Sequence, residues 1–209
     1  MMDKDFESKH VEIKRLLACN THLGEYNCEK LMKNYVWRQR KDGIFIIDIS
    51  KTIEKIKMAS RAIVAIKNPD NIISISTSNI GQKGVIGFSR FTGSQLSVGR
   101  WIPGKLTNQM CKDYLEPQLI ILTNPEIDFR PLNEAAYVNL PAIAFSTTNS
   151  SLKFIDIVIP GNNTNRHSVA ILWWLLTREV LRLKGVLSKS EEWDVKIETF
   201  LDNELISSD

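Results

Sequence analysis

One stretch of sequence decides the fold: it reads YVNLPAIAF at residues 137–145, FIDIVIP at 154–160 and SVAILWWLLTREVLRLKG at 168–185. The first two segments are short apolar runs bounded by turn residues, which is the pattern of buried parallel strands. Pro160 has no amide hydrogen to donate to a sheet, so it ends the second strand. In the third segment apolar residues recur every three or four positions, which predicts a helix with one buried face, and Gly185 is placed to end it.

The remainder of the chain continues this alternation of apolar runs and amphipathic stretches. Strands alternating with helices at such spacing predict an α/β domain with a mostly parallel sheet covered on both faces. Pro103 and Gly104 interrupt regular structure, so a loop is expected at residues 100–109. We expect strands at residues 43–49, 72–76, 95–98 and 119–123, helices at 6–18, 81–91 and 131–137, and a further helix capped by Ser50 or Thr52 and running to Ile66.

Length and composition predict a single domain. A chain of 209 residues that is 43% hydrophobic can bury a full core without crosslinks. Three cysteines and a start without a basic or apolar leader predict a soluble protein of a reducing compartment. No apolar run approaches the roughly 20 residues of a membrane span, so no membrane association is expected. We place the domain at residues 1–187 and an acidic tail at 188–209, whose apolar residues are expected to form a weak helix packed on the domain.

Charge is distributed unevenly along the chain. The net charge is +3, yet residues 188–209 carry seven acids and two lysines, so the residues before them carry +8. Residues 71–112 contain no Asp or Glu, although they contain spaced lysines and arginines. Such a stretch suits a polyanion, because each neutralised phosphate releases counterions. The alternative is ordinary fluctuation in a mildly basic protein.

The candidate RNA-binding cations fall in two groups. The first lies at residues 29–41, where Tyr35 and Trp37 are interleaved with the charges, a pattern that suits phosphate contacts and stacking on unpaired bases. The second lies in the acid-free stretch, where Arg100 and Lys105 are expected on a protruding turn. The alternative for each is an ordinary solvated surface. The full set is Lys30, Lys33, Arg38, Arg40, Lys41, Lys83, Arg90, Arg100 and Lys105.

Three glycines, Gly81, Gly84 and Gly87, lie between a predicted strand and a predicted helix, where phosphate-binding loops occur. Their order is not that of the dinucleotide fingerprint, and no Gly-Lys-Ser/Thr ending follows. Close packing of the helix on the sheet explains the glycines more simply. We therefore expect no nucleotide or other cofactor and no small-molecule substrate.

Side chains suited to metal binding or catalysis are present but poorly spaced. Cys19 and His22 form one Cys-x-x-His, and no second pair completes a structural zinc site. No nucleophile motif accompanies the histidines. Asp48 and Asp156 sit in apolar runs and are expected to cap the helices that follow them, not to serve as acid and base. We therefore expect neither a metal site nor an enzyme.

Adjacent tryptophans, Trp173 and Trp174, point about 100° apart on the predicted helix. One ring is expected to face the sheet, while the other meets a neighbouring helix or a partner protein. Core packing is the first interpretation for the pair. The candidates for a surface that contacts a partner protein are Trp174 and, in the tail, Trp193.

Further sequence blocks extend the pattern quoted at the start. They read LACNTHLG at 17–24, SRAIVAI at 60–66 and GRWIPGKLTNQ at 99–109. Together with NLPAIAF, DIVIP and WWLLTREVLRLKG, these blocks closely resemble the ribosomal protein SA family, also called the laminin receptor precursor. This family is the eukaryotic and archaeal counterpart of bacterial small-subunit protein two.

The resemblance implies a flavodoxin-like, doubly wound three-layer α/β sandwich. It also implies a structural role in the small ribosomal subunit, in its assembly and in translation, through contacts with small-subunit ribosomal RNA. Neighbouring small-subunit proteins, among them proteins five and twenty-one of the eukaryotic set, are the implied protein partners. The implied location is the cytoplasmic ribosome, with passage through the nucleus or nucleolus if the chain is eukaryotic. No cofactor is implied.

Two loops depart from the family pattern. Residues 146–151 read STTNSS where the family has Cys-Asp-Thr-Asp-Ser-Pro, and residues 162–165 read NNTN where it has Asn-Asn-Lys-Gly. The sequence also lacks the long acidic extension of animal members, so laminin-receptor activities are not expected to carry over. The bacterial coiled-coil insertion is absent as well. The alternative function is that of an extra-ribosomal interaction protein at the cell surface or on the cytoskeleton.

Overall fold

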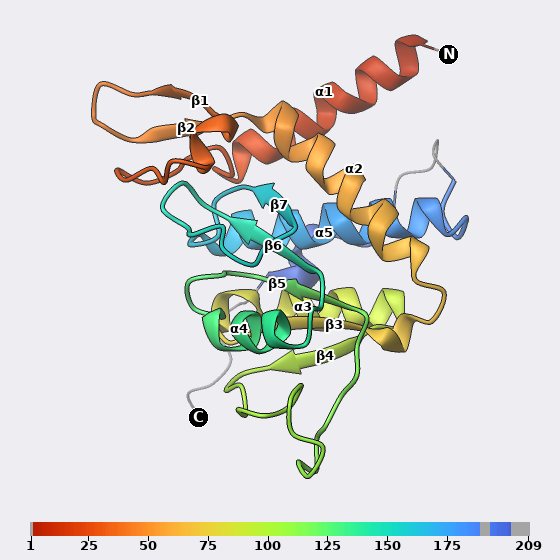
Figure 1. The fold of residues 1–209 in the computed structure, drawn as a ribbon. Helices are drawn as coiled ribbons and strands as arrows, with labels where there is room; N and C mark the ends of the chain where they lie inside the picture. The colour runs from red at the N-terminus through yellow and green to blue at the C-terminus, as the bar shows by residue number, and fades with distance from the viewer. Residues whose placement is uncertain (1, 189–192, 202–209) are drawn as a thin grey trace, which may run out of the picture.

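A five-stranded parallel sheet forms the centre of the computed structural model, which describes residues 2–188 and 193–201 (Figure 1). The strand order is β4-β3-β5-β6-β7. Counted along the chain within this sheet, the order is 2-1-3-4-5, the doubly wound arrangement of flavodoxin-like folds. The strands are β3 (Ile72–Ser76), β4 (Gln95–Val98), β5 (Leu119–Leu122), β6 (Ala142–Ser146) and β7 (Ile157–Pro160).

Helices cover both faces of the sheet and complete three layers. One face packs against α2 (Ile49–Ala65), α3 (Asn79–Thr92) and α5 (Arg166–Leu183), with α1 (Met2–Ala18) against α2 and α5. The other face packs against α4 (Phe129–Tyr137) and the loop between β4 and β5. The single-turn helices are η1 (Met32–Tyr35), η2 (Pro69–Asn71) and η3 (Ile197–Phe200).

Side chains of the strands alternate between the two apolar layers. Ile121 belongs to the core beneath α5, whereas its neighbours Ile120 and Leu122 belong to the core beneath α4. All four residues of β5 are buried, as expected for a strand covered on both faces. The predicted single α/β domain with a doubly wound, mostly parallel sheet is confirmed.

Residues 43–49 were expected to form the first strand. A strand lies there, but it does not belong to the parallel sheet. They contribute β2 (Phe45–Ile47), which pairs with β1 (Val36–Gln39) in a separate antiparallel hairpin and forms an isolated antiparallel bridge between Ile46 and Leu23. The turn lies at Asp42-Gly43: Gly43 has a φ of 87°, and the Arg40 amide donates to the Ile44 carbonyl at 2.8 Å. An Asp-Gly pair between two β-forming segments is a strong sequence signal for a hairpin. The segment before this pair is rich in cations, so it was not predicted to be a strand.

Helix ends follow local chemistry, with two corrections. Asp48 caps α2 by accepting from the Ser50 amide at 3.0 Å, so the predicted Asp48 cap is confirmed and the predicted Ser50 or Thr52 cap is wrong. Asp156 caps no helix; its carboxylate accepts from the Ala142 amide at 2.9 Å and ties the start of β7 to β6. The Ala142 amide at the start of the neighbouring strand β6 is the donor to Asp156, in place of the helix N-terminal amides that a capping residue would bind. Gly185, with a φ of 76°, follows the end of α5 as predicted.

The C-terminal segment packs on the domain. Its expected weak helix is the single turn η3, which contacts α3 and α5 and buries Phe200 to 1% exposure. Trp193 lies against Phe91 with ring centroids 5.0 Å apart. Residues 189–192 and 202–209 of the predicted tail lie outside the described part of the chain.

Candidate nucleic-acid interface

The most concentrated group of predicted RNA-binding cations lies on one element, the basic hairpin, which we define as residues 30–47. All five cations of the first group are exposed. Asp42 is the only acid in this segment, and it pairs with Arg40 at 3.1 Å on a surface where both side chains are more than half exposed. Solvent screens such a pair strongly, so it does little to cancel the local positive charge. The five cations are Lys30, Lys33, Arg38, Arg40 and Lys41.

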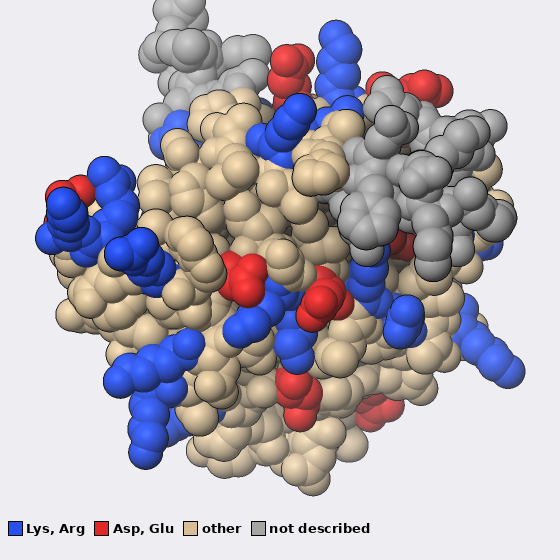
Figure 2. All heavy atoms as spheres, turned by 90° about the horizontal axis from the view of Figure 1, so that it is seen from above, with Lys and Arg blue, Asp and Glu red and all other residues tan. Residues whose placement is uncertain are grey.

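The shape of the molecule makes the hairpin accessible. In Figure 1 the β1–β2 hairpin extends beyond the sheet and its helices at the upper left. Figure 2 shows blue side chains gathered at that same side of the molecule, beside a face that is mostly tan. A positive projection of this kind can approach a phosphate backbone without steric hindrance from the rest of the domain.

A rigid base holds the hairpin. The Ile47 amide donates to the His22 carbonyl at 2.8 Å, and the Asp48 amide donates to the Tyr35 carbonyl at 2.9 Å. Two apolar residues of the hairpin segment itself, Met32 and Ile47, are buried, at 0% and 2% exposure. The cations therefore project from an anchored scaffold and not from a free loop.

The STTNSS loop at residues 146–151 supports that base. The Thr148 hydroxyl accepts from the Glu25 amide at 2.8 Å, and the Asn149 side-chain amide donates to the Glu25 carboxylate at 2.8 Å. Gly24 fits so closely against Thr148 that a Cβ at position 24 would fall 2.5 Å from the Thr148 methyl group. The loop therefore positions the segment that leads into the hairpin.

The β4–β5 loop places its two candidate cations differently. Arg100 is exposed, but Lys105 is half-buried, with its ammonium 3.4 Å from the Ser97 hydroxyl and 5.5 Å from the ring centre of Trp101. The expectation that both residues sit on a protruding turn is therefore wrong for Lys105. The reason is Glu134 of α4, whose carboxylate accepts from the Trp101 indole at 3.2 Å and from the Gly104 amide at 2.9 Å.

Lys83 and Arg90 lie on α3 and do not join the hairpin. Arg90 is exposed in the last turn of this helix, and Lys83 is half-buried earlier in it. Figure 1 shows α3 below the hairpin, behind the sheet. The structure thus brings together the five cations of the first group, whereas the four of the acid-free stretch are distributed over α3 and the β4–β5 loop.

Neither candidate of the partner surface is freely exposed. Trp173 is confirmed as a core residue: it is 0% exposed and packs against Phe88 and Phe145, with ring centroids 5.2 and 5.1 Å away. Trp174 is 3% exposed and stacks on Trp193 at 5.6 Å between centroids. The Trp174 indole also donates to the Val195 carbonyl at 2.8 Å. The C-terminal segment thus covers Trp174 and leaves Trp193 half-buried.

The three glycines of α3 are confirmed as packing residues. A Cβ on Gly81 would fall 2.5 Å from Ser76 and Thr123 at the ends of two strands, and one on Gly84 would fall 2.5 Å from the Trp173 ring. A Cβ on Gly87 would fall 2.7 Å from the Phe200 ring. Glycine therefore allows α3 to approach the sheet, α5 and the C-terminal segment.

At the carboxyl edge of the sheet, Asp128 bridges the loops that follow β3 and β5. Its carboxylate accepts from the Thr77 amide at 2.8 Å and from the Asn124 amide at 3.2 Å. Doubly wound folds commonly bind ligands between these two strands. Asp128 is 0% exposed, and burial raises its pKa above the ordinary value. Sequence reasoning missed this residue because its partners lie 51 and 4 positions away.

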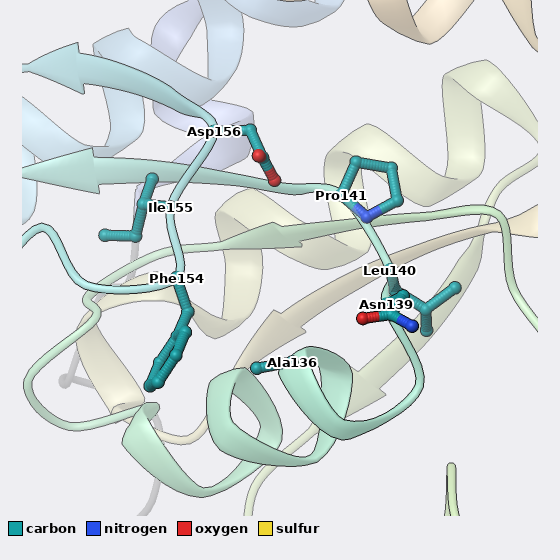
Figure 3. A pocket seen from close by; sticks show the side chains of 7 residues that line it. All are labelled: Ala136, Asn139, Leu140, Pro141, Phe154, Ile155 and Asp156. Atoms are coloured by element: carbon teal, nitrogen blue, oxygen red, sulfur yellow. The ribbon is translucent and has the colours of Figure 1, made fainter.

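A hollow of about 620 Å³ lies at the opposite edge, beside the end of α4. Figure 3 shows Phe154 extending toward α4, with Asn139 and Asp156 at other points of the rim. None of its lining residues is a lysine or arginine, so it is separate from the basic hairpin. Across the described residues, no group of three or more His, Cys, Asp or Glu side chains is arranged to hold a metal ion. No helix in that part of the chain is long and apolar enough to cross a membrane.

Comparison with known proteins matches this chain to one family. The family model described as ribosomal protein S2 matches residues 16–113 and 109–182. Relatives named small ribosomal subunit protein uS2 include that of Diaphorina citri, which is 43% identical over 192 residues covering 92% of this chain and 64% of the relative. The Drosophila persimilis relative is 45% identical, with 92% and 71% covered, and the Trichoplax adhaerens relative is 45% identical, with 88% and 64% covered.

These relatives are longer than the chain, which spans between 64% and 71% of their length. Their similarity nevertheless extends over both the hairpin and the sheet. With the doubly wound fold and the matched blocks from residue 16 to residue 182, it identifies the chain as a member of the ribosomal protein S2 family.

Proposed function

We propose that this chain is a structural constituent of the small ribosomal subunit and that its basic hairpin binds small-subunit ribosomal RNA. The relatives named uS2 support the assignment to the small subunit. In this role the protein performs no chemistry. Its cations neutralise phosphates, and its rigid α/β body holds them in a fixed arrangement.

The single observation that carries the RNA contact is the charge of the basic hairpin. Five exposed cations against one acid lie on a projecting element whose base is hydrogen-bonded to the domain. Each phosphate that they neutralise would release counterions, which gives affinity without base specificity. Arg100 is proposed as a further phosphate contact from the β4–β5 loop. The remaining candidates are less accessible or lie further from the basic hairpin, and we propose them as secondary contacts to RNA: Lys83, Arg90 and Lys105.

Protein partners follow from the same assignment. We propose contacts with neighbouring small-subunit proteins, five and twenty-one of the eukaryotic set among them, and a requirement for the chain in subunit assembly and translation. The proposed location is the cytoplasmic ribosome, with nuclear or nucleolar passage during assembly. We also propose that the chain divides into an α/β domain at residues 1–187 and an acidic tail at 188–209.

A sucrose-gradient experiment tests the proposal. The tagged chain is expressed in cells, and its distribution between free protein, small subunits and whole ribosomes is measured at physiological salt. We expect nearly all of it with small subunits and ribosomes. Recovery mainly in the soluble fractions would contradict the ribosomal role and favour an extra-ribosomal interaction protein.

The charge of the hairpin is tested in the same gradients. The triple variant Arg38→Gln, Arg40→Gln, Lys41→Gln should move a large share of the chain to the free fractions. A matched control removes three exposed cations elsewhere, through Arg61→Gln, Lys67→Gln and Lys153→Gln. Equal loss from both variants would mean that net charge matters but the hairpin does not.

A further inference from the structure

An exposed tryptophan stands at an irregularity of the basic hairpin. The β1–β2 register pairs Val36 with Ile47 and Arg38 with Ile46, so Trp37 is the extra residue of a β-bulge. Bulges change the direction in which a side chain points and often lie beside functional sites. The Trp37 side chain is 69% exposed, whereas the tryptophans at 101, 173 and 174 are at most 3% exposed. The indole is therefore available for a contact outside the domain.

Exposed cations lie on the same hairpin as this tryptophan. Arg38 follows it directly, and Arg40 and Lys41 lie at the turn of the same hairpin, all exposed. A second exposed aromatic residue, Tyr26, is also 69% exposed and lies against Gly43 of that turn, where a Cβ would fall 3.4 Å from its ring. The hairpin therefore presents flat aromatic surfaces beside positive charges, which is the arrangement that binds single-stranded nucleic acid.

The charges favour RNA over a protein as the partner of Trp37. A protein docking here would have to supply several acids to pair with the hairpin cations or leave those cations desolvated. A single strand supplies a phosphate at every nucleotide and a π-face on every base. Duplex RNA offers the phosphates but keeps its bases stacked on one another, so it cannot cover the indole in the same way.

We propose that Trp37 is a stacking platform for an unpaired RNA base, while the neighbouring cations bind the flanking phosphates. This inference rests on the proposed RNA contact of the hairpin and adds a preference for single strands over duplexes. Stacking is tolerant of base identity, so the preference is for an unpaired state and not for a sequence.

Binding of the purified chain to short RNAs tests the inference. The probes are a labelled, unstructured ten-nucleotide RNA and a labelled ten-base-pair RNA duplex, and affinity is measured by fluorescence anisotropy at several salt concentrations. Trp37→Ala should weaken single-strand binding by about 5- to 150-fold, the range measured for loss of one base–aromatic stack. Trp37→Phe should recover most of it, and duplex affinity should stay at the wild-type value. Because the ring is exposed, circular dichroism and the unfolding midpoint should not change.

A matched control is Tyr137→Ala, which removes an aromatic side chain that is 83% exposed at the far end of α4. It should leave the affinity for both RNAs unchanged. Tryptophan fluorescence gives a second readout. In the wild type, the single-stranded RNA should quench the emission of Trp37 and protect this residue from quenching by acrylamide. The Trp37→Phe variant should lack this acrylamide-accessible part of the emission.

The outcomes separate this inference from the proposed function. Suppose that the triple charge variant loses RNA affinity. If Trp37→Ala then keeps its affinity for the single strand, or loses affinity for single strand and duplex equally, Trp37 is not a stacking platform, while the RNA contact of the hairpin stands. If Trp37→Ala reduces incorporation into subunits with unchanged RNA affinity, Trp37 docks on a protein and the inference is again wrong. If the charge variant itself leaves RNA affinity and its salt dependence unchanged, the RNA contact of the hairpin fails.

Discussion

The indole ring of Trp173 occupies the space in which a side chain on Gly84 would lie: a Cβ at position 84 would fall 2.5 Å from the Trp173 Cδ1 atom. This contact joins α3 to α5, the pair of helices with the most extensive mutual contact in the domain. The contact explains why glycine occurs at position 84 in the interior of α3, although glycine costs about 1 kcal/mol in helix propensity relative to alanine.

Gly84→Ala is therefore expected to destabilise the protein although alanine is the better helix former. Overpacking against a buried ring costs about 1–3 kcal/mol, which exceeds the propensity gain. We expect a net loss of up to about 2 kcal/mol in the free energy of unfolding, measured by urea denaturation. Ile86→Ala, on the exposed side of the same helix, is the control and should change stability by less than about 0.5 kcal/mol. A variant at position 84 as stable as the wild type would mean that the indole can move.

Trp173→Ala should cost about 3–5 kcal/mol, because it removes a fully buried ring and leaves a cavity between α3, α5 and β6. The expected result in cells is degradation before assembly, and in vitro a lower urea midpoint. Trp37→Ala removes the same side chain from an exposed site and should stay within about 0.5 kcal/mol of the wild type. Similar losses from both variants would contradict the core assignment of Trp173.

Asp128 gives a pH-dependent prediction. Burial raises its pKa, and this effect exceeds that of the hydrogen bonds from Thr77 and Asn124, which lower the pKa. The folded chain therefore binds the carboxyl proton more tightly than the unfolded chain. The ionisation of Asp128 thus lowers stability as the pH rises from the ordinary Asp pKa of 3.8 through the folded pKa.

Asp128→Asn removes this titration. At the acid end we expect the variant to be less stable than the wild type by about 1–3 kcal/mol, because the amide cannot accept from both backbone donors. The deficit should shrink as the pH rises, since only the wild type loses stability over that window. Urea denaturation between pH 4 and pH 8 measures it, with the exposed Asp70→Asn as the charge control. A deficit that grows with pH would reverse the sign of the assigned pKa shift.

Arg100 and Lys105 should behave differently when changed to alanine. Arg100→Ala should reduce the slope of log affinity against log salt for RNA by about one unit without affecting stability. Lys105→Ala should reduce the slope by clearly less than Arg100→Ala, as expected of a secondary contact, and should lower stability by about 0.5–1 kcal/mol, because the ammonium lies near the Trp101 ring. Equal effects of the two variants on the salt slope would show that Lys105 leaves that contact when RNA binds.

The sequence predicted the regular core well because local patterns determine it. The strands at 72–76 and 95–98 have the predicted bounds, and α5 follows from the apolar spacing that surrounds Trp173. Here hydrophobic periodicity and turn residues agree, so tertiary contacts only reinforce the local preference.

The parts that were missed depend on contacts between distant residues. Glu134 holds the β4–β5 loop from 30 positions away, and this contact turns Lys105 inward. Trp174 meets Trp193 across 19 positions, so the helical spacing was compatible with a packed ring but did not indicate that the C-terminal segment would cover it. The bulge at Trp37 depends on the strand register, which the sequence specifies only weakly because three of the four residues of β1 are exposed.

The most direct test of the central claim is a density map of small subunits that contain this chain. We predict that the α/β body is seated on the subunit surface and that the side chains of Arg38, Arg40 and Lys41 lie within hydrogen-bonding distance of ribosomal RNA phosphates. A hairpin that faces only solvent or only protein would contradict the account. So would a map in which the chain is absent from subunits purified at physiological salt.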